Sequence, residues 1–113
     1  MKALSSRLTL VLSLLTLNFT IASAQDLDTA TLYGRIQDQN TAVIPGATIE
    51  ATLLKTHTIR TVVSDAEGRY RLIQLEPGFY SLRVSFSGFA VQEMKELLTV
   101  SGQNIEINFV LLP

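Results

Sequence analysis

Apolar and polar residues alternate one by one along most of the chain after residue 30. In the segment 104–111, polar side chains stand at Asn104, Glu106 and Asn108, and apolar ones take the positions between and after them. The apolar positions hold Ile105, Ile107, Phe109 and Leu111. Successive side chains of a β-strand point to opposite faces, so a period of two predicts a strand with one face buried and one in water.

The same alternation predicts seven strands. They cover about residues 32–37, 47–53, 58–64, 69–75, 80–86, 91–100 and 104–111. The segment 91–100 is the least regular, because Met94, Leu97 and Leu98 also fit one turn of a helix.

Turn residues separate these strands. Pro45-Gly46 and Pro77-Gly78 each place a proline, whose φ is near −65°, before a glycine that can take positive φ. That combination is the one a type II turn requires. Gly88 and Ser101-Gly102 mark two further reversals. Short strands with turns about every 8–12 residues predict an all-β fold, a seven-stranded antiparallel β-sandwich.

The stretch Asp65-Ala66-Glu67-Gly68 has three interpretations: a calcium loop, a catalytic carboxylate pair, or a turn. Counting from Asp65, Arg69 and Tyr70 stand where a calcium loop needs an oxygen ligand and a glycine. No apolar surroundings are in view that would raise the pKa of one carboxyl group for acid–base chemistry. A turn fits best, with the Asp65 side chain accepting backbone N–H bonds and Gly68 at positive φ. We therefore predict a β-hairpin here.

The first 24 residues have the form of a secretory signal peptide. Lys2 and Arg7 precede an apolar run over residues 8–21, and Ala22-Ser23-Ala24 is a typical cleavage site. The run is short for a span of about 30 Å of hydrocarbon. We expect cleavage between Ala24 and Gln25, a short extension over residues 25–29, and the sandwich over residues 30–113.

Removing 24 of the 113 residues leaves one domain with all 10 acidic residues and 7 of the 9 basic ones, hence a net charge near −3. This negative charge argues against nucleic acid or an anionic membrane surface as partner. The chain has no cysteine. A disulfide-rich scaffold is therefore excluded, and no lipid anchor is expected at the mature N-terminus.

Candidate catalytic and metal-binding residues are few. His57 is the only histidine and falls at a predicted hairpin tip, where a solvent-exposed role is typical. One histidine without cysteine is a poor zinc set, and no Gly-x-Ser-x-Gly sequence presents a serine nucleophile. No glycine-rich phosphate loop occurs either. We predict no catalytic residue, no metal site and no cofactor.

The strand pattern also assigns side chains to the outer surface. Arginines and glutamates mix there, which is typical of a solvated face. These outward charges are Arg35, Arg69, Arg71, Arg83, Glu50, Glu67 and Glu106. The pattern places Tyr70, Tyr80, Phe86 and Phe109 inside. It leaves Tyr33 as the outward ring and the one candidate ligand-binding residue.

The order of these motifs resembles the carboxypeptidase regulatory-like domain over about residues 30–112. The matching positions are Gly34, Ile36, Asp38, Pro45-Gly46-Ala47, Asp65, Gly68, Tyr70, Leu75, Pro77-Gly78, Tyr80 and Gly88-Phe89. Asn40 departs from the family, which commonly has glycine there. Asparagine also tolerates positive φ, so we expect the turn to survive. The resemblance implies a seven-stranded β-sandwich like that of transthyretin (prealbumin).

The resemblance implies an accessory role. In metallocarboxypeptidases the module accompanies the catalytic domain without supplying catalytic residues, and in many TonB-dependent outer-membrane receptors it follows the signal peptide. This sequence stops at Pro113 without plug or barrel strands, which leaves open a stand-alone periplasmic protein or a truncated frame. We expect a non-enzymatic exported module, periplasmic, outer-membrane associated or extracellular.

Two partner classes follow from this reading. The first is a protein that binds an edge strand or the loops at the outer membrane. The alternative is a glycan, with the chain acting as a carbohydrate-binding module through Tyr33. The sequence fixes neither the identity of that partner nor the oligomeric state.

Overall fold

The computed structural model describes residues 28–113, which form eight strands. The predicted signal peptide and its cleavage site at Ala24 and Gln25 lie outside the described residues. No helix in the described part is long and apolar enough to cross a membrane. The strands are β1 (Ala30–Asp38), β2 (Thr48–Leu53), β3 (Thr58–Val63), β4 (Arg69–Leu75), β5 (Gly78–Ser85), β6 (Gln92–Thr99), β7 (Asn104–Glu106) and β8 (Phe109–Leu111).

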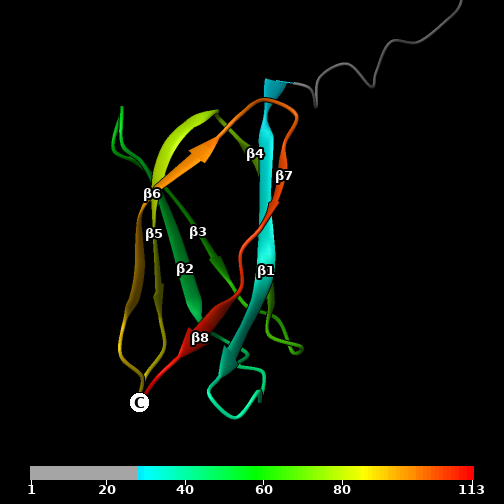
Figure 1. The fold of residues 1–113 in the computed structure, drawn as a ribbon, viewed down its shortest axis with the longest axis vertical. Coiled ribbons are helices and arrows are strands. Elements are labelled where there is room, and N and C mark those ends of the chain that lie inside the picture. The colour runs from blue at the N-terminus through cyan, green and yellow to red at the C-terminus, as the bar shows by residue number, and fades with distance from the viewer. Residues whose placement is uncertain (1–27) are drawn as a thin grey trace, which may run out of the picture.

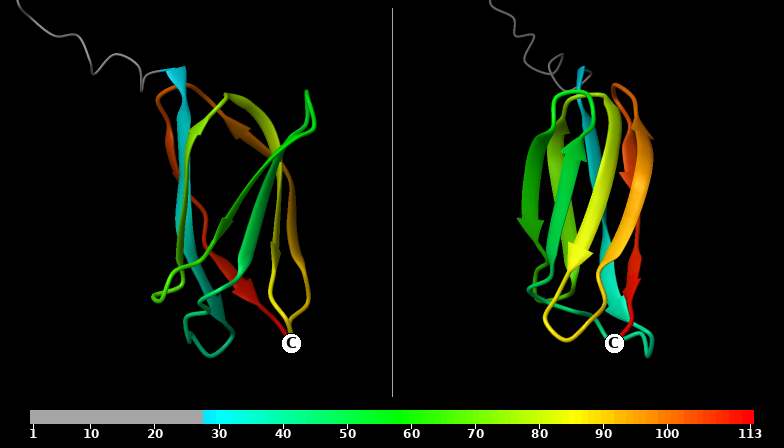
Figure 2. Two further views of the ribbon diagram at one scale, coloured as in Figure 1. Left: turned by 180° about the vertical axis from the view of Figure 1, so that it is seen from behind. Right: turned by 90° about the vertical axis from the view of Figure 1, so that its left-hand side faces the viewer.

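The strands form two sheets that pack face to face (Figures 1 and 2). One sheet has the order β4-β1-β7, with β8 also paired to β1 beyond β7. The other has the order β3-β2-β5-β6. The right-hand view of Figure 2 shows β3 at one margin of this second sheet and β6 at the other. The predicted all-β sandwich is confirmed.

The core lies between the sheets and follows the predicted alternation. Tyr70, Tyr80 and Phe109 are buried as expected, and the rings of Tyr70 and Phe109 lie 6.4 Å apart in a tilted arrangement. Phe86 is only partly buried and packs against Phe89 at the margin of the core. The fully buried aliphatic side chains include Leu32, Ile36, Ile49, Leu72, Leu75, Leu82, Val84 and Leu111.

The prediction of seven antiparallel strands is wrong at the end of the chain. The segment 104–111 is interrupted, so that β7 and β8 are separate strands, and both pair with β1 in parallel. Figure 1 shows β1, β7 and β8 running in the same direction. The register survives the interruption, because Leu32 pairs with Ile105 and Ile36 with Phe109 at the same offset.

A side-chain hydrogen bond replaces one backbone bond of the β1 ladder at this interruption. Ile107 donates its N–H to the Tyr33 carbonyl (2.9 Å), and a regular parallel ladder would then bond the Arg35 N–H to the Ile107 carbonyl. Instead, Arg35 donates to Asn108 Oδ1 (2.8 Å). The Ile107 carbonyl turns towards the core and accepts the Tyr70 hydroxyl (2.6 Å). Gly34 makes room for it, since a Cβ there would overlap the Ile107 oxygen.

The stretch Asp65–Gly68 is a turn, as predicted, but the predicted hairpin is wrong. Asp65 Oδ1 accepts the N–H groups of Glu67 and Arg69, both at 2.9 Å, and Gly68 has φ of 75°. β3 and β4, however, belong to different sheets. The turn carries the chain across the sandwich instead of joining two paired strands.

A second turn repeats the same hydrogen bonds at the end of β1. Asp38 Oδ1 accepts the N–H groups of Asn40 (2.8 Å) and Ala42 (3.0 Å). The positive φ at this turn falls on Thr41 (66°), in the place that Gly68 takes in the first turn. The turn therefore survives at Asn40, as expected, although the positive φ falls on the next residue.

The two Pro-Gly pairs differ from each other. Gly46 has φ of 83°, as a type II turn requires. Gly78 has φ of 148° and opens β5, so the predicted type II turn at Pro77-Gly78 is wrong. Thr99 holds this strand end instead: its hydroxyl accepts the Gly78 N–H (3.1 Å) and donates to the Gly78 carbonyl (2.9 Å). The reversal at Gly88, with φ of 89°, is confirmed.

Candidate functional site

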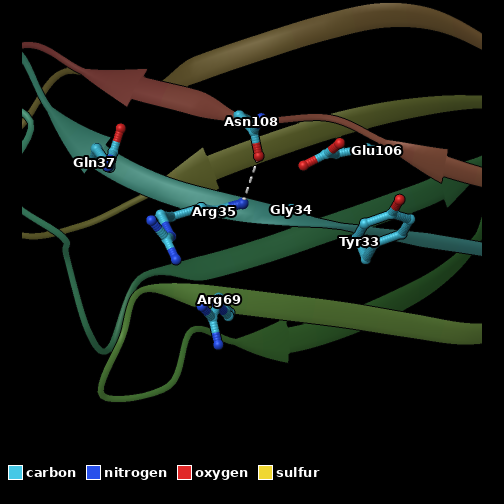
Figure 3. A pocket seen from close by; sticks show the side chains of 7 residues that line it. All are labelled: Tyr33, Gly34, Arg35, Gln37, Arg69, Glu106 and Asn108. Atoms are coloured by element: carbon cyan, nitrogen blue, oxygen red, sulfur yellow. Dashed lines mark hydrogen bonds between the residues drawn. The ribbon is translucent and has the colours of Figure 1, made fainter.

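The outer face of the β4-β1-β7 sheet carries a shallow depression of 440 Å³. Figure 3 shows its side chains spread over the sheet, with β1 through the middle. The lining residues are Tyr33, Gly34, Arg35, Gln37, Arg69, Glu106 and Asn108.

Strand geometry brings these residues together. Leu32 and Ile36 of β1 point into the core, so the alternate residues Tyr33, Arg35 and Gln37 point outward. The register then sets their neighbours across the strands. Arg35 pairs with Arg69 of β4, and Tyr33 lies between Arg71 of β4 and Glu106 of β7. Tyr33 and three of the arginines predicted to point outward, Arg35, Arg69 and Arg71, are thus gathered on one face, whereas Arg83 lies on the other sheet.

Within residues 28–113, the side chains of the arginines on this face form no ion pair or hydrogen bond. Within residues 28–113 the one ion pair joins Arg83 to Glu93 (3.8 Å), and it lies on the other sheet. The guanidinium hydrogen bonds within these residues come from Arg60, and Arg35, Arg69 and Arg71 make none there. Like charges directly opposite each other on neighbouring strands destabilise a sheet, so the Arg35–Arg69 pair is unfavourable for the unliganded fold.

Two aromatic rings are exposed within residues 28–113, and the sequence pattern predicted only one of them. Tyr33 is 38% exposed in the middle of the face described above, as predicted. Phe79 is 49% exposed on β5 of the opposite sheet, where it lies opposite Leu98 of β6. Phe79 was missed because Pro77-Gly78 was read as a turn and the strand was expected to begin at Tyr80.

Two of the sheet margins carry bulges. β4 has one extra residue between Leu72 and Leu75, and Gln74 there has φ of 56°. The Arg60 guanidinium reaches over from β3 to the Ile73 and Gln74 carbonyls, at 2.9 and 3.3 Å. β6 has one extra residue between Met94 and Leu97. Bulges on edge strands disfavour the addition of another strand.

β3 is the regular edge. All six of its residues pair with β2 in one register, without a bulge. Ser64 donates its N–H to the Ala47 carbonyl (2.9 Å), and antiparallel bonds alternate along the strand. The N–H and C=O groups of Ile59, Thr61 and Val63 therefore point away from the sheet. Ile59 and Val63 are also more than half exposed.

The remaining candidate residues do not converge. His57 is exposed at the β2–β3 tip with φ of 64°, which confirms its predicted position. Asp65 Oδ1 is occupied by backbone N–H groups of its own turn. Among residues 28–113, no three side chains of His, Cys, Asp or Glu lie close enough together to hold a metal ion.

Comparisons with known proteins agree with the predicted resemblance. The family model of the carboxypeptidase regulatory-like domain matches residues 31–112. The TonB-dependent transporter Oar of Myxococcus xanthus is 32% identical over 92 residues, which cover 80% of this chain and 9% of the transporter. The chain thus spans about a tenth of the length of that relative.

Solved structures share the sandwich. A protein from Bacteroides uniformis, proposed to bind carbohydrate, has a TM-score of 0.61 at 22% identity, over 75% of this chain and 42% of that one. Chlorocatechol 1,2-dioxygenase from Pseudomonas putida has a TM-score of 0.60 at 11% identity, over 80% of this chain and 63% of the enzyme. At such identities the likeness concerns the fold alone.

Proposed function

This chain belongs to the carboxypeptidase regulatory-like domain family, and from that membership we propose that it is an exported, non-catalytic interaction module associated with a TonB-dependent outer-membrane receptor system. Residues 1–24 are the signal peptide, cut between Ala24 and Gln25. Residues 25–29 are a short extension, and residues 30–113 are the binding domain. The module works in the periplasm or at the outer membrane.

The β3 edge is the observation that carries the interaction role. Ile59, Thr61 and Val63 offer outward N–H and C=O groups along a straight strand, and an extended segment of another protein can add there as a further strand. The bulges in β4 and β6, and the interruption between the short strands β7 and β8, direct such addition to β3. Thr58–Val63 contains no acidic residue and one basic residue, Arg60, whose side chain is bonded to β4.

The proposal of a non-catalytic role rests on what the candidate catalytic groups do. The carboxylate of Asp65 holds a turn, and His57 stands at the exposed β2–β3 tip and is not among the residues that line the depression on the β4-β1-β7 sheet. The Tyr70 and Tyr80 hydroxyls donate to backbone carbonyls of Ile107 and Glu76, both at 2.6 Å. These groups stabilise strands and turns, and they are not arranged around a common reacting centre.

The test places a photo-cross-linking amino acid at position 61 in cells of a Gram-negative host that contains the cognate receptor. We expect a cross-linked product with a TonB-dependent receptor, recovered from the outer-membrane fraction. The matched control carries the same amino acid at Lys95, in the β6 bulge, and should give no product. Intact mass should show a chain that begins at Gln25.

A substitution pair then tests the edge itself. Thr61→Pro removes an outward N–H without touching the bonds to β2 and should abolish the cross-link from a probe at position 59. Thr61→Val keeps that N–H and should leave the cross-link intact. Equal products from positions 61 and 95, or retention of residues 1–24, would contradict the proposal. So would peptide or ester hydrolysis that is lost in His57→Ala.

Carbohydrate binding is the second candidate function, and the exposed Tyr33 ring favours it. An aromatic face stacks on the apolar face of a sugar ring, while amides such as those of Gln37 and Asn108 bond hydroxyl groups. The Bacteroides uniformis protein has the same sandwich fold, but its proposed ligand supports this candidate only by analogy. A glycan array with wild-type protein and Tyr33→Ala tests it.

A further inference from the structure

The arginines on the outer face of the β4-β1-β7 sheet indicate what kind of sugar would bind. We propose that this face binds an acidic polysaccharide, in which Arg35 and Arg69 hold a carboxylate and Tyr33 stacks on a sugar ring. The inference rests on the second candidate function, carbohydrate binding, and names its ligand class.

Arg35 and Arg69 form the centre of the proposed site. They are direct cross-strand partners, so their Cβ atoms lie about 5 Å apart and both side chains rise from the same face. Figure 3 shows both side chains on this face, Arg35 on β1 and Arg69 on the neighbouring β4. Neither has an acidic partner within residues 28–113. A single carboxylate between them would satisfy both cations with charge-assisted hydrogen bonds and remove their mutual repulsion.

The surroundings of this pair fit a sugar chain. Tyr33 is two residues from Arg35 on the same face, about 7 Å along the strand, which is the scale of one sugar ring. Asn108 Oδ1 is held by the Arg35 N–H, so the amide orientation is fixed and Nδ2 remains a donor. Gln37 adds a second amide at the other end of the depression.

The charges of the face are unevenly distributed. Arg69 and Arg71 lie on β4, whereas Glu106 lies on the β7 side of Tyr33. A carboxylate bound over β4 is attracted, and one bound over β7 is repelled. The Glu106 carboxylate can instead accept a hydrogen bond from a sugar hydroxyl. The ligand is therefore expected to bind in one orientation.

The backbone of this face argues against a peptide ligand. β1 is paired on both sides, with β4 and with β7 and β8, so its N–H and C=O groups are already used. Extended peptides bind mainly through such groups, which this face does not offer. Anionic membranes are recognised by clusters of about 4–8 cations, more than the three arginines here.

Calorimetry with polygalacturonate tests the proposal, with its fully methyl-esterified form as a neutral control of the same backbone. We expect binding of polygalacturonate that weakens with salt, and at least about ten-fold weaker binding of the ester. Arg69→Gln should weaken polygalacturonate binding by about ten-fold or more while keeping or raising the melting temperature, because it removes a like-charge pair. The control Arg83→Gln, on the other sheet, should leave the affinity for polygalacturonate unchanged.

The other possible results distinguish the inference of an acidic ligand from the proposal of carbohydrate binding. Equal binding of polygalacturonate and its ester, lost in Tyr33→Ala, would overturn the acidic-ligand inference and leave carbohydrate binding standing. Absence of binding to both, and to every glycan on the array, would overturn both. Binding to vesicles of anionic phospholipid without binding to polygalacturonate would replace the polysaccharide by a membrane surface.

Discussion

At the scale of single residues, two turns of the same geometry place different residues at the same strained position. The turns Asp38–Ala42 and Asp65–Arg69 share their hydrogen bonds, down to a backbone bond from the fourth residue to the first (3.0 and 2.9 Å). The fourth residue has φ of 66° in Thr41 and 75° in Gly68. Positive φ costs a β-branched residue about 1–3 kcal/mol, whereas glycine adopts it freely.

The two positions should therefore respond in opposite directions to substitution. Thr41→Gly should raise the free energy of unfolding by about 1 kcal/mol, since relief of strain outweighs the added chain entropy. Gly68→Ala should lower it by about 2 kcal/mol or more, because the new Cβ would stand 2.7 Å from the Ile36 carbonyl oxygen. Urea unfolding of both variants checks this. A loss of stability in Thr41→Gly would show that the Thr41 side chain is needed.

At the scale of strands, side chains complete the ladders where backbone bonds are missing. Asn108 does so for β1, and Thr99 does so for the start of β5. The hydroxyl of the buried Ser64 accepts the Ala47 N–H (2.8 Å) and donates to the Ile44 carbonyl (2.7 Å). Each of these polar side chains lies where a regular backbone ladder ends. The alternation of apolar residues in the sequence does not predict their hydrogen bonds.

The Tyr70 hydroxyl at the β7–β8 interruption gives stability an alkaline limit. Burial, and to a lesser extent Glu106, raises the pKa of Tyr70 above its usual value near 10. The folded state then holds this proton more tightly than the unfolded state. Its contribution is complete below about pH 10 and is lost as pH rises towards the folded pKa.

Tyr70→Phe should show this by comparison with the parent protein. The variant loses the bond to Ile107 and about 1 kcal/mol of unfolding free energy at pH 8. Between pH 9 and about 11 its stability should fall less steeply than that of the parent. Tyr33→Phe, at an exposed ring, is the control. Parallel pH profiles for the parent and Tyr70→Phe would refute this role.

Strand existence could be predicted from the sequence, whereas strand pairing could not. Every segment predicted as a strand contains one, although the segment 104–111 holds two. The helix-like spacing of Met94 and Leu97 comes from an extra residue in a bulge, which alternation cannot reveal. Asp65 and Gly68 indicate a tight turn equally well within one sheet or between two. The destination of the chain after the turn depends on long-range packing.

At the scale of the whole molecule, the same limit applies to the candidate site. Alternation placed Tyr33, Arg35 and Arg69 outside, and the structure agrees. Their meeting in one depression depends on the register of β1 against β4 and β7, which no local pattern specifies. The arginines were therefore interpreted as a diluted solvated face, and their concentration on one sheet was missed.

The parallel pairing of β1 with β8 has a mechanical consequence. β1 begins at one end of the sandwich and β8 finishes at the opposite end (Figure 1). Tension applied between residues 30 and 111 pulls these strands past each other along their length. It loads the hydrogen bonds of the ladder together instead of one after another.

Single-molecule pulling can measure this resistance, and the chain has no cysteine to interfere with cysteine handles. Handles at the exposed residues Asp28 and Leu112, next to β1 and β8, should give a high rupture force. Handles at Phe79 and Leu98, which are exposed and paired near one end of an antiparallel ladder, should open it bond by bond at a much lower force. Equal forces would refute the shear geometry. A module built in this way would transmit tension between its two ends without unfolding.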